Sequence, residues 1–361
     1  MLTITSIVLG GILILVAVLL AWSYPGKPKP FVDQNGHPLA GSISEKIYLN
    51  INGVKQGMFI KSKDVNNPVL LYLHGGMPDY FLAEKYPTGF DNYFTVVWWE
   101  QRGSGMSYSP GIPPETMTLE QMMSDTLELT NYLRQRFGKE KIYLMGHSGG
   151  TFIGIQVAAL SPELYYAYIG VAQTSNQLKS EKLVYDYMLE QLRANGNTNM
   201  VRKLEAAPVT MTGGTPDAYR ALRDPFMHRL GIGTTRDMNS VITGIFLPSL
   251  QCHDYTLGEK IDLWRGKATS GISSLWDEMI TTDLSEQVTE FHLPVYFFSG
   301  IYDYTCNYTL AKDYFEKLHA PVKGFYTFEH SAHCPIFEEP DKTLKILRED
   351  VLAGENNLTD R

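Results

Sequence analysis

The sequence predicts an α/β protein with a mainly parallel sheet covered by helices. Short apolar runs such as Val69 to Leu73 and Phe94 to Trp99 are typical of strands buried on both faces. Helix-like segments separate these runs, and one of them begins at Thr118, with Gln121 as its capping-box partner. Such alternation indicates right-handed βαβ crossovers and therefore parallel pairing. The rhythm stops near Asn176 and resumes near Pro294, which indicates an inserted segment.

The first 22 residues predict a membrane anchor. From Leu2 to Trp22 there is no charged side chain, and the stretch is long enough to cross a bilayer as one helix of about 20 residues. A cleaved signal peptide is the alternative, with a small-x-small site at Ala21 to Ser23. The segment lacks a basic leading region and exceeds the usual apolar length of such peptides, so we expect a single-pass transmembrane helix.

Flanking charges and glycosylation sequons point to opposite sides of the membrane. Lys27 and Lys29 follow the apolar stretch and favour a cytoplasmic catalytic domain. Two glycosylation sequons, at Asn307 and Asn357, would favour the opposite side, although such triplets often arise by chance.

Five segments follow from these patterns. A proline-spaced polar linker joins the anchor to a hairpin whose turn is Asn52-Gly53. Between Asn176 and Phe291 helix-like stretches alternate with glycine breaks, which predicts a helical cap inserted into the core. The predicted segments are an anchor at 1–22, a linker at 23–45, the first part of the core at 46–175, the cap at 176–291 and the second part of the core at 292–361.

Composition excludes several classes of protein. The chain has 361 residues, 44% of them hydrophobic and 19% charged, so it is globular. Its net charge of −8 and the lack of a Lys and Arg run argue against a nucleic-acid partner. Three cysteines are too few for a disulfide framework or a metal cluster, and we expect no cofactor. Cys306 and Cys334 could meet, but free thiols are the preferred interpretation.

The stretch from Ile142 to Leu160 predicts a nucleophile elbow. An apolar run leads into a Gly-x-Ser-x-Gly turn, and a helix-like segment follows. In that order the pattern lifts Ser148 above the carboxyl end of the sheet on a strained turn. Cβ atoms at Gly146 and Gly150 would collide where strand and helix pass each other. Ser148 is therefore the candidate nucleophile.

Chain order selects the candidate acid and base. An apolar strand ends at Ser299, and the loop after it carries Asp303. The next strand is followed by a loop with His333. His330 is the rival base, but it lies at the strand end, so we favour His333. An elbow serine needs such a base, and the base needs a carboxylate that holds its tautomer.

A glycine loop after the strand Val69 to Leu73 supplies the candidate oxyanion hole. Glycine lets the backbone approach a substrate closely, and two backbone N–H groups must point at the developing charge. We assign these donors to Gly76 and to Gly149, with Gly75 as the alternate for Gly76.

These landmarks occur in the order of a known family. The chain resembles the α/β-hydrolases and, within them, the proline iminopeptidase branch, from about Lys46 to Leu352. The Gln-Arg-Gly element is the most branch-specific landmark. The chain departs from the family pattern at Glu100, Met77-Pro78 and Gly149. These departures bear on which substrate is bound and leave the expected reaction chemistry unchanged. The landmarks are His74-Gly75-Gly76, Glu100-Gln101-Arg102-Gly103-Ser104-Gly105-Met106-Ser107, Gly146-His147-Ser148-Gly149-Gly150, Gly300-Ile301-Tyr302-Asp303, and His333 with Glu338-Glu339-Pro340.

The resemblance implies an α/β-hydrolase fold and a serine hydrolase that works through an acyl-enzyme, and the N-terminal stretch predicts that this enzyme is anchored to a membrane. We expect an aminopeptidase of the proline iminopeptidase type that acts on small peptides. A carboxylesterase or lipase with the same triad is the nearest alternative, and a catalytically silent, membrane-tethered binding protein is the third. Family members bind the substrate amine with cap carboxylates, but no spacing in this cap singles out such a site. Four tryptophans could line an apolar pocket, but core packing is the preferred explanation for Trp98, Trp99, Trp264 and Trp276.

Overall fold

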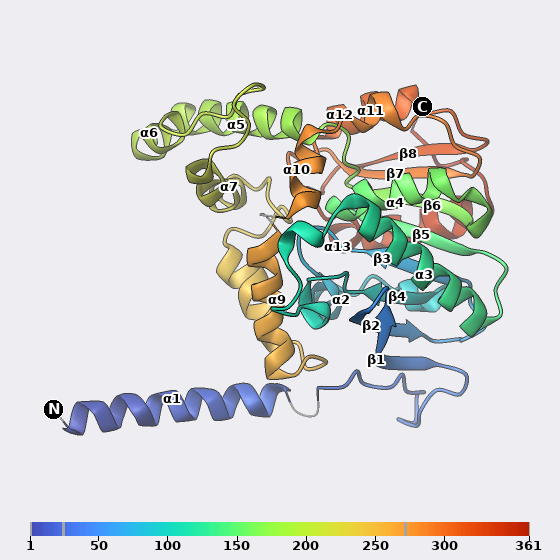
Figure 1. Cartoon of the computed structure of the whole chain (residues 1–361), viewed down its shortest axis with the longest axis horizontal. Coiled ribbons are helices and arrows are strands. Elements are labelled where there is room, and N and C mark those ends of the chain that lie inside the picture. Colours follow the sequence, from blue (N-terminus) through green and yellow to red (C-terminus); the bar gives the residue numbers. More distant parts are fainter. Residues whose placement is uncertain (1, 24–25, 271–272, 361) are drawn as a thin grey trace.

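The computed structural model describes residues 2–23, 26–270 and 273–360, and within them the chain forms a sheet of eight strands. The strand order is β1-β2-β4-β3-β5-β6-β7-β8. The pairs β1–β2 and β2–β4 are antiparallel, and the pairs β4–β3, β3–β5, β5–β6, β6–β7 and β7–β8 are parallel. The predicted mainly parallel sheet with flanking helices is therefore confirmed (Figure 1). The strands are β1 (Ile43–Ile51), β2 (Val54–Ser62), β3 (Val69–Leu73), β4 (Thr95–Trp99), β5 (Ile142–His147), β6 (Tyr165–Val171), β7 (Val295–Gly300) and β8 (Lys323–Phe328).

The antiparallel part of the sheet begins with the predicted hairpin. Asn52 and Gly53 both have positive φ, 44° and 78°, as a two-residue turn between antiparallel strands requires. The parallel strands differ in pattern, because β3, β4, β5 and β7 are buried along their whole length. Continuous apolar runs therefore mark the strands that lie between two helical layers.

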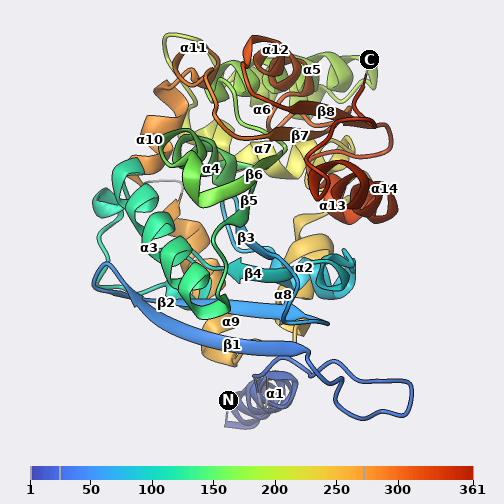
Figure 2. The ribbon, with the colours of Figure 1, turned by 90° about the vertical axis from the view of Figure 1, so that its right-hand side faces the viewer.

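Helices cover both faces of the sheet (Figure 2). One apolar core lies under α3, α4 and α12, and the other lies under α2, α13 and α14. Thr118 caps α3 as predicted, since its side chain accepts a hydrogen bond from the backbone N–H of Gln121. These helices are α2 (Tyr80–Lys85), α3 (Leu119–Phe137), α4 (Gly149–Leu160), α12 (Tyr308–Lys317), α13 (Pro335–Glu338) and α14 (Pro340–Ile346). Short turns of other helix types are η1 (Phe90–Asn92), η2 (Gly105–Ser107), η3 (Pro114–Thr116), η4 (Pro162–Leu164), η5 (Ile242–Phe246) and η6 (Leu347–Val351).

Between β6 and β7 the chain leaves the sheet, and we call residues 176–291 the cap segment. Its described residues form helices, together with isolated bridges, and contribute no strand to the sheet. Part of it has its own apolar core, built around Val184, Met188 and Tyr219. In Figure 1 most of its helices, α5, α6, α7, α9 and α10 among them, lie to the left of the sheet, and α11 lies above it. They are α5 (Gln177–Ala194), α6 (Thr198–Glu205), α7 (Asp217–Arg229), α8 (Leu247–Gln251), α9 (Leu257–Ser270), α10 (Ser274–Thr281) and α11 (Leu284–Gln287).

The predicted anchor falls in helix α1 (Leu2–Ser23), which projects from one corner of the molecule (Figure 1). Met1, at the start of the predicted anchor, and residues 24–25 of the predicted linker lie outside the described residues. Within the described part of the chain, no helix has both the length and the apolar character to cross a bilayer. The transmembrane part of the prediction is therefore not supported.

Candidate active site

Ser148 lies at the sharp turn between β5 and α4. Its backbone has φ 55° and ψ −124°, which is a strained conformation for a residue with a side chain. A Cβ atom on Gly150 would lie 2.1 Å from the carbonyl oxygen of Leu73, and one on Gly146 would lie 2.7 Å from the carbonyl oxygen of Gly150. The steric reason predicted for both glycines is therefore confirmed.

The structure brings Asp303 and His333 together. Nδ1 of His333 lies 3.1 Å from Oδ1 and 3.0 Å from Oδ2 of the Asp303 carboxylate, which is fully buried. Oδ1 also accepts hydrogen bonds from the backbone N–H groups of Thr305 (2.8 Å) and Cys306 (3.0 Å). Asp303 is thus both a turn aspartate and the partner of His333.

His330, the rival base, is exposed at the surface. Its backbone N–H donates to Oε1 of Glu339 (2.9 Å), and its ring does not line the cavity described below. Glu338 holds the other side of the same loop, because its carboxylate accepts from the backbone N–H groups of Ala332 (2.8 Å) and Arg236 (2.6 Å). Burial raises the pKa of Glu338 to about 7, against the opposing effect of these hydrogen bonds. The Glu338-Glu339 pair therefore fixes the loop that carries His333.

The glycine loop after β3 lies directly against the elbow. A Cβ atom on Gly75 would lie 2.7 Å from Cβ of Ser148 and 3.1 Å from its Oγ. A Cβ atom on Gly149 would lie 3.9 Å from the backbone N of Gly76. The two glycines predicted to donate to an oxyanion, Gly76 and Gly149, therefore lie on adjacent backbone segments beside Ser148.

A second histidine–aspartate pair, which no motif in the sequence marks, lies behind the elbow. His147 is buried, with Nδ1 3.0 Å from Oδ2 of Asp79 and Nε2 3.0 Å from the backbone carbonyl oxygen of His333. The hydroxyl of Tyr72 also donates to Oδ2 of Asp79 (2.7 Å). Burial lowers the pKa of His147, but the hydrogen bond and charge of Asp79 outweigh it and raise the pKa above 6.5. No spacing in the sequence signals that Asp79 and His147 meet.

The Gln-Arg-Gly element packs beside the glycine loop. The backbone N–H of Gln101 donates to Nε2 of His74 (3.1 Å), and the Gln101 side chain donates to the His74 carbonyl (2.9 Å). Burial lowers the pKa of His74 to about 4, so its ring is neutral at pH 7. Arg102 forms a two-pronged ion pair with the buried Asp125, at 2.7 and 2.9 Å. The element is therefore a rigid support beneath the site.

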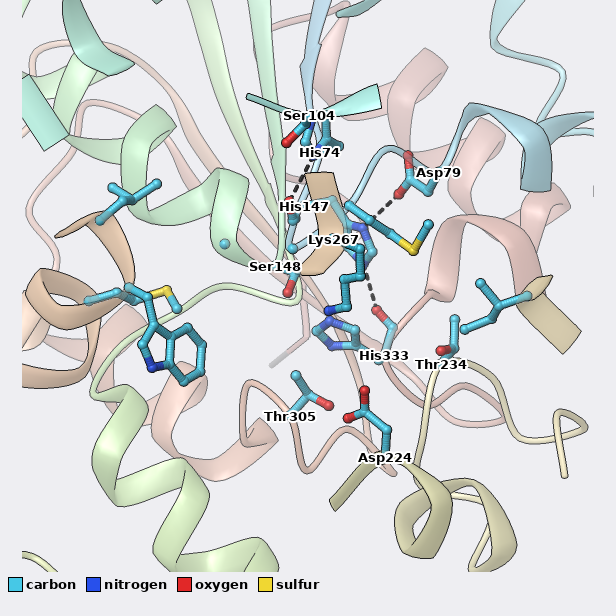
Figure 3. A pocket seen from close by; sticks show the side chains of 18 of the residues that line it. His74, Asp79, Ser104, His147, Ser148, Asp224, Thr234, Lys267, Thr305 and His333 are labelled. Atoms are coloured by element: carbon cyan, nitrogen blue, oxygen red, sulfur yellow. Dashed lines mark hydrogen bonds and ion pairs between the residues drawn. The ribbon is translucent and has the colours of Figure 1, made fainter. Parts of the chain in front are cut away.

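A cavity of about 450 Å³ opens between the sheet edge and the cap segment. Ser148, His333 and the glycine loop form its floor, and side chains of α7 and α9 form part of its walls (Figure 3). Trp264 and Trp276 line it, whereas Trp98 and Trp99 lie in the core on β4. The volume suits a small molecule.

Three carboxylates line the cavity: Asp79, Glu181 and Asp224. Glu181 is buried and accepts hydrogen bonds from Arg223 (2.7 and 3.0 Å) and Tyr219 (2.8 Å). Asp224 also pairs with Arg223, at 2.8 Å, but its side chain is 46% exposed. Of the three, Asp224 is therefore the most accessible to a ligand.

All three cysteines are buried free thiols. Sγ of Cys334 lies 3.6 Å from Nε2 of His147, and Sγ of Cys306 lies 3.5 Å from Oγ1 of Thr174. Burial raises the pKa of both thiols, which makes them poor nucleophiles. In the described ranges, no group of three or more His, Cys, Asp or Glu side chains is arranged to hold a metal ion.

Comparison with known proteins places this geometry in a family. The family model for the alpha/beta hydrolase fold matches residues 68–340. A probable aminopeptidase of Bacillus subtilis, YbaC, is 31% identical over 84% of this chain and 95% of that protein.

Solved structures that are similar in fold include the following two. A proline iminopeptidase from Mycobacterium smegmatis aligns with 86% of this chain and 100% of its own, at 15% identity and a TM-score of 0.62. A bacterial membrane phospholipase A aligns with 98% of this chain and 96% of its own, at 16% identity and a TM-score of 0.60. The resemblance predicted from the sequence is confirmed, and the chain belongs to the α/β-hydrolase family.

Proposed function

We propose that this protein is a serine hydrolase that works through an acyl-enzyme, and that it acts as an aminopeptidase on small peptides. The observation that carries the proposal is the buried Asp303–His333 pair, whose histidine lines the same cavity as Ser148 on its strained turn. The roles are those predicted from chain order: Ser148 attacks, His333 moves the proton and Asp303 orients His333.

The tautomer of His333 follows from its contacts. Because Nδ1 faces the Asp303 carboxylate, Nδ1 carries the hydrogen and Nε2 is free to accept the proton of Ser148 Oγ. Attack on the substrate carbonyl forms the Oγ–C bond and an oxyanion, which the N–H groups of Gly76 and Gly149 stabilise. Collapse breaks the C–N bond, and the imidazolium of His333 returns the proton to the leaving amine. A water molecule then attacks the acyl-enzyme carbonyl with His333 as the base, and breakage of the Oγ–C bond frees Ser148.

Two findings support a peptidase. The relative at 31% identity is a probable aminopeptidase, and the match covers nearly all of that protein. The cavity also offers the half-exposed carboxylate of Asp224, which can bind a protonated N-terminal amine. Burial would raise the pKa of Asp224, but the charges of Arg223 and Lys267 outweigh it and hold the pKa below 3.8. Asp224 is thus a carboxylate at neutral pH.

An esterase or lipase is the second candidate, because the fold of a bacterial membrane phospholipase A matches nearly the whole chain. Apolar side chains in the cavity wall would accommodate an acyl chain; they include Met77, Phe81, Leu82, Ile153 and Ile245.

An active-serine phosphonate probe tests the chemistry first. We expect it to label the folded protein at Ser148 and to leave Ser148→Ala unlabelled and inactive. Absence of labelling would favour the silent binding protein instead. A proline aminoacyl anilide and a short acyl ester then separate the two enzyme classes, since turnover of the ester alone would rule out the peptidase.

We also propose that α1 attaches the protein to a membrane. Its side chains form an exposed aliphatic surface, which favours contact with an apolar phase. Vesicle flotation should recover the full chain, and a chain without residues 1–22 should remain unbound; equal recovery would reject the attachment. The exposed side chains are Ile7, Val8, Leu9, Ile12, Leu13, Ile14, Leu15, Val16, Val18 and Leu20.

A further inference from the structure

Lys267 of α9 places an ammonium group beside the predicted oxyanion hole. A Cβ atom on Gly76 would lie 3.3 Å from Nζ of Lys267. Lys267 lines the same cavity as Ser148 and His333, and in Figure 3 its side chain points toward the space between them. A cation is thus positioned within reach of a substrate carbonyl on Ser148.

The position of Lys267 is set by close packing of the residue before it. A Cβ atom on Gly266 would lie 2.8 Å from the carbonyl oxygen of Gly103 and 2.9 Å from Cα of Ser104. Only glycine therefore lets α9 approach this loop so closely. The loop itself follows the Arg102–Asp125 ion pair, which anchors it to the core. Lys267 is consequently held over the site by the packing of α9 on this loop.

Opposite charges line the cavity on two different helices. Asp224 belongs to α7 and Lys267 belongs to α9, and both side chains face the cavity (Figure 3). Such an arrangement complements a small molecule that carries an amine at one end and an anion at the other.

We propose that Lys267 binds the C-terminal carboxylate of a dipeptide, so that the enzyme selects dipeptides with a free carboxylate. This inference rests on the proposed aminopeptidase function. In a dipeptide three bonds separate the scissile carbonyl carbon from the carboxylate carbon, and they span at most about 4.3 Å. A carboxylate on that tether stays close to the oxyanion hole, where Lys267 lies. In a longer peptide an uncharged peptide bond takes the same place, and the charge-assisted hydrogen bond is lost.

The test compares substrates that differ by one charge. Kinetics are measured with prolylglycine, prolylglycinamide and a proline anilide whose leaving group carries no charge, on the full chain and on three variants. We expect the full chain to prefer prolylglycine over its amide by roughly 10- to 100-fold in kcat/KM, as a hydrogen bond to a charged group allows. Lys267→Met should abolish this preference, and Lys267→Arg should retain most of it.

Arg265→Met is the matched control, because Arg265 is on the same helix with its side chain 60% exposed and outside the cavity. It should keep the full preference. Phosphonate labelling of each variant shows that its site is folded.

Three results would overturn the inference: equal kcat/KM for the two peptides on the full chain, an unchanged preference in Lys267→Met, or an equal loss on all three substrates in that variant. The last would mean that Lys267 acts on the oxyanion and not on a carboxylate. Failure of the aminopeptidase function gives a different pattern, since the full chain would then cleave an ester and none of the three prolyl substrates.

Discussion

His147 connects Asp79 to the backbone of His333: its Nδ1 lies 3.0 Å from the Asp79 carboxylate and its Nε2 lies 3.0 Å from the His333 carbonyl oxygen. Both ring nitrogens can donate only when the ring is protonated, and Asp79 favours that form by raising the pKa above 6.5 against the effect of burial. The residue before the elbow serine therefore ties the glycine loop to the loop of His333.

We predict that His147→Gln lowers kcat by roughly 10- to 100-fold with little change in KM, because the loop of His333 loses a positioning contact and not a substrate contact. Steady-state kinetics measure this split. Tyr72→Phe is the control, since it removes another hydrogen bond to Asp79 and leaves the ion pair. An equal rise in KM for both variants would contradict a positioning role.

The same variant should alter the pH dependence of stability. A histidine whose pKa is raised in the folded state stabilises the protein fully below 6.5, and this contribution is lost as pH rises through the raised value. The difference in free energy of unfolding between the unmodified chain and His147→Gln should therefore shrink from pH 5.5 toward high pH, as urea titration can measure. A difference that grows with pH would show that the ring is buried neutral.

Asp303→Asn should lower kcat by roughly 10³- to 10⁴-fold and leave the fold intact. The amide oxygen can still accept from the backbone N–H groups of Thr305 and Cys306, so the turn is retained, but His333 loses the partner that sets its tautomer. His330→Ala, which changes an exposed ring, should keep most of the activity. The opposite ranking would transfer the base role to His330.

Gly150→Ala should destabilise the protein by about 3 kcal/mol or more, because the new methyl group would overlap the backbone of Leu73. Gly149→Ala is the matched control for folding, since the nearest atoms to its methyl group would lie 3.8 Å away. Thermal unfolding followed by circular dichroism should give a much lower Tm for Gly150→Ala alone. Similar values for both variants would mean that the elbow relaxes more easily than its packing indicates.

Glu100 is buried and accepts hydrogen bonds from the Tyr255 hydroxyl and the backbone N–H of Met106. Burial raises its pKa to about 8, against the effect of these bonds. Its stabilising contribution is therefore present below 4.5 and is lost as pH rises through 8. As pH rises from 4.5 to 8, the free energy of unfolding of Glu100→Gln should increase relative to that of the unmodified chain, by roughly 3 to 5 kcal/mol in total. Urea unfolding at pH 5 and pH 8 measures the change, and a constant difference would refute it.

Local patterns in the sequence determined the parallel sheet, the strained turn at Ser148 and the family, because buried strands and close strand–helix passages need particular residues at particular positions. Chain order also predicted that Asp303 and His333 follow neighbouring strands, and the structure places them in contact. The transmembrane part of the prediction, which rested on the length and apolar composition of the first 22 residues, is the part that the structure does not support.

Only the tertiary structure decided which charged groups meet. Asp79 and His147 are 68 residues apart, and Lys267 is far from Gly76 in the chain. No period or spacing connects such residues, since their contact depends on how α9 packs on the Gln-Arg-Gly loop and how the glycine loop folds over the elbow. The charged groups that line the cavity are therefore brought together by packing between distant segments, whereas the candidate nucleophile, acid and base are marked by local motifs and chain order.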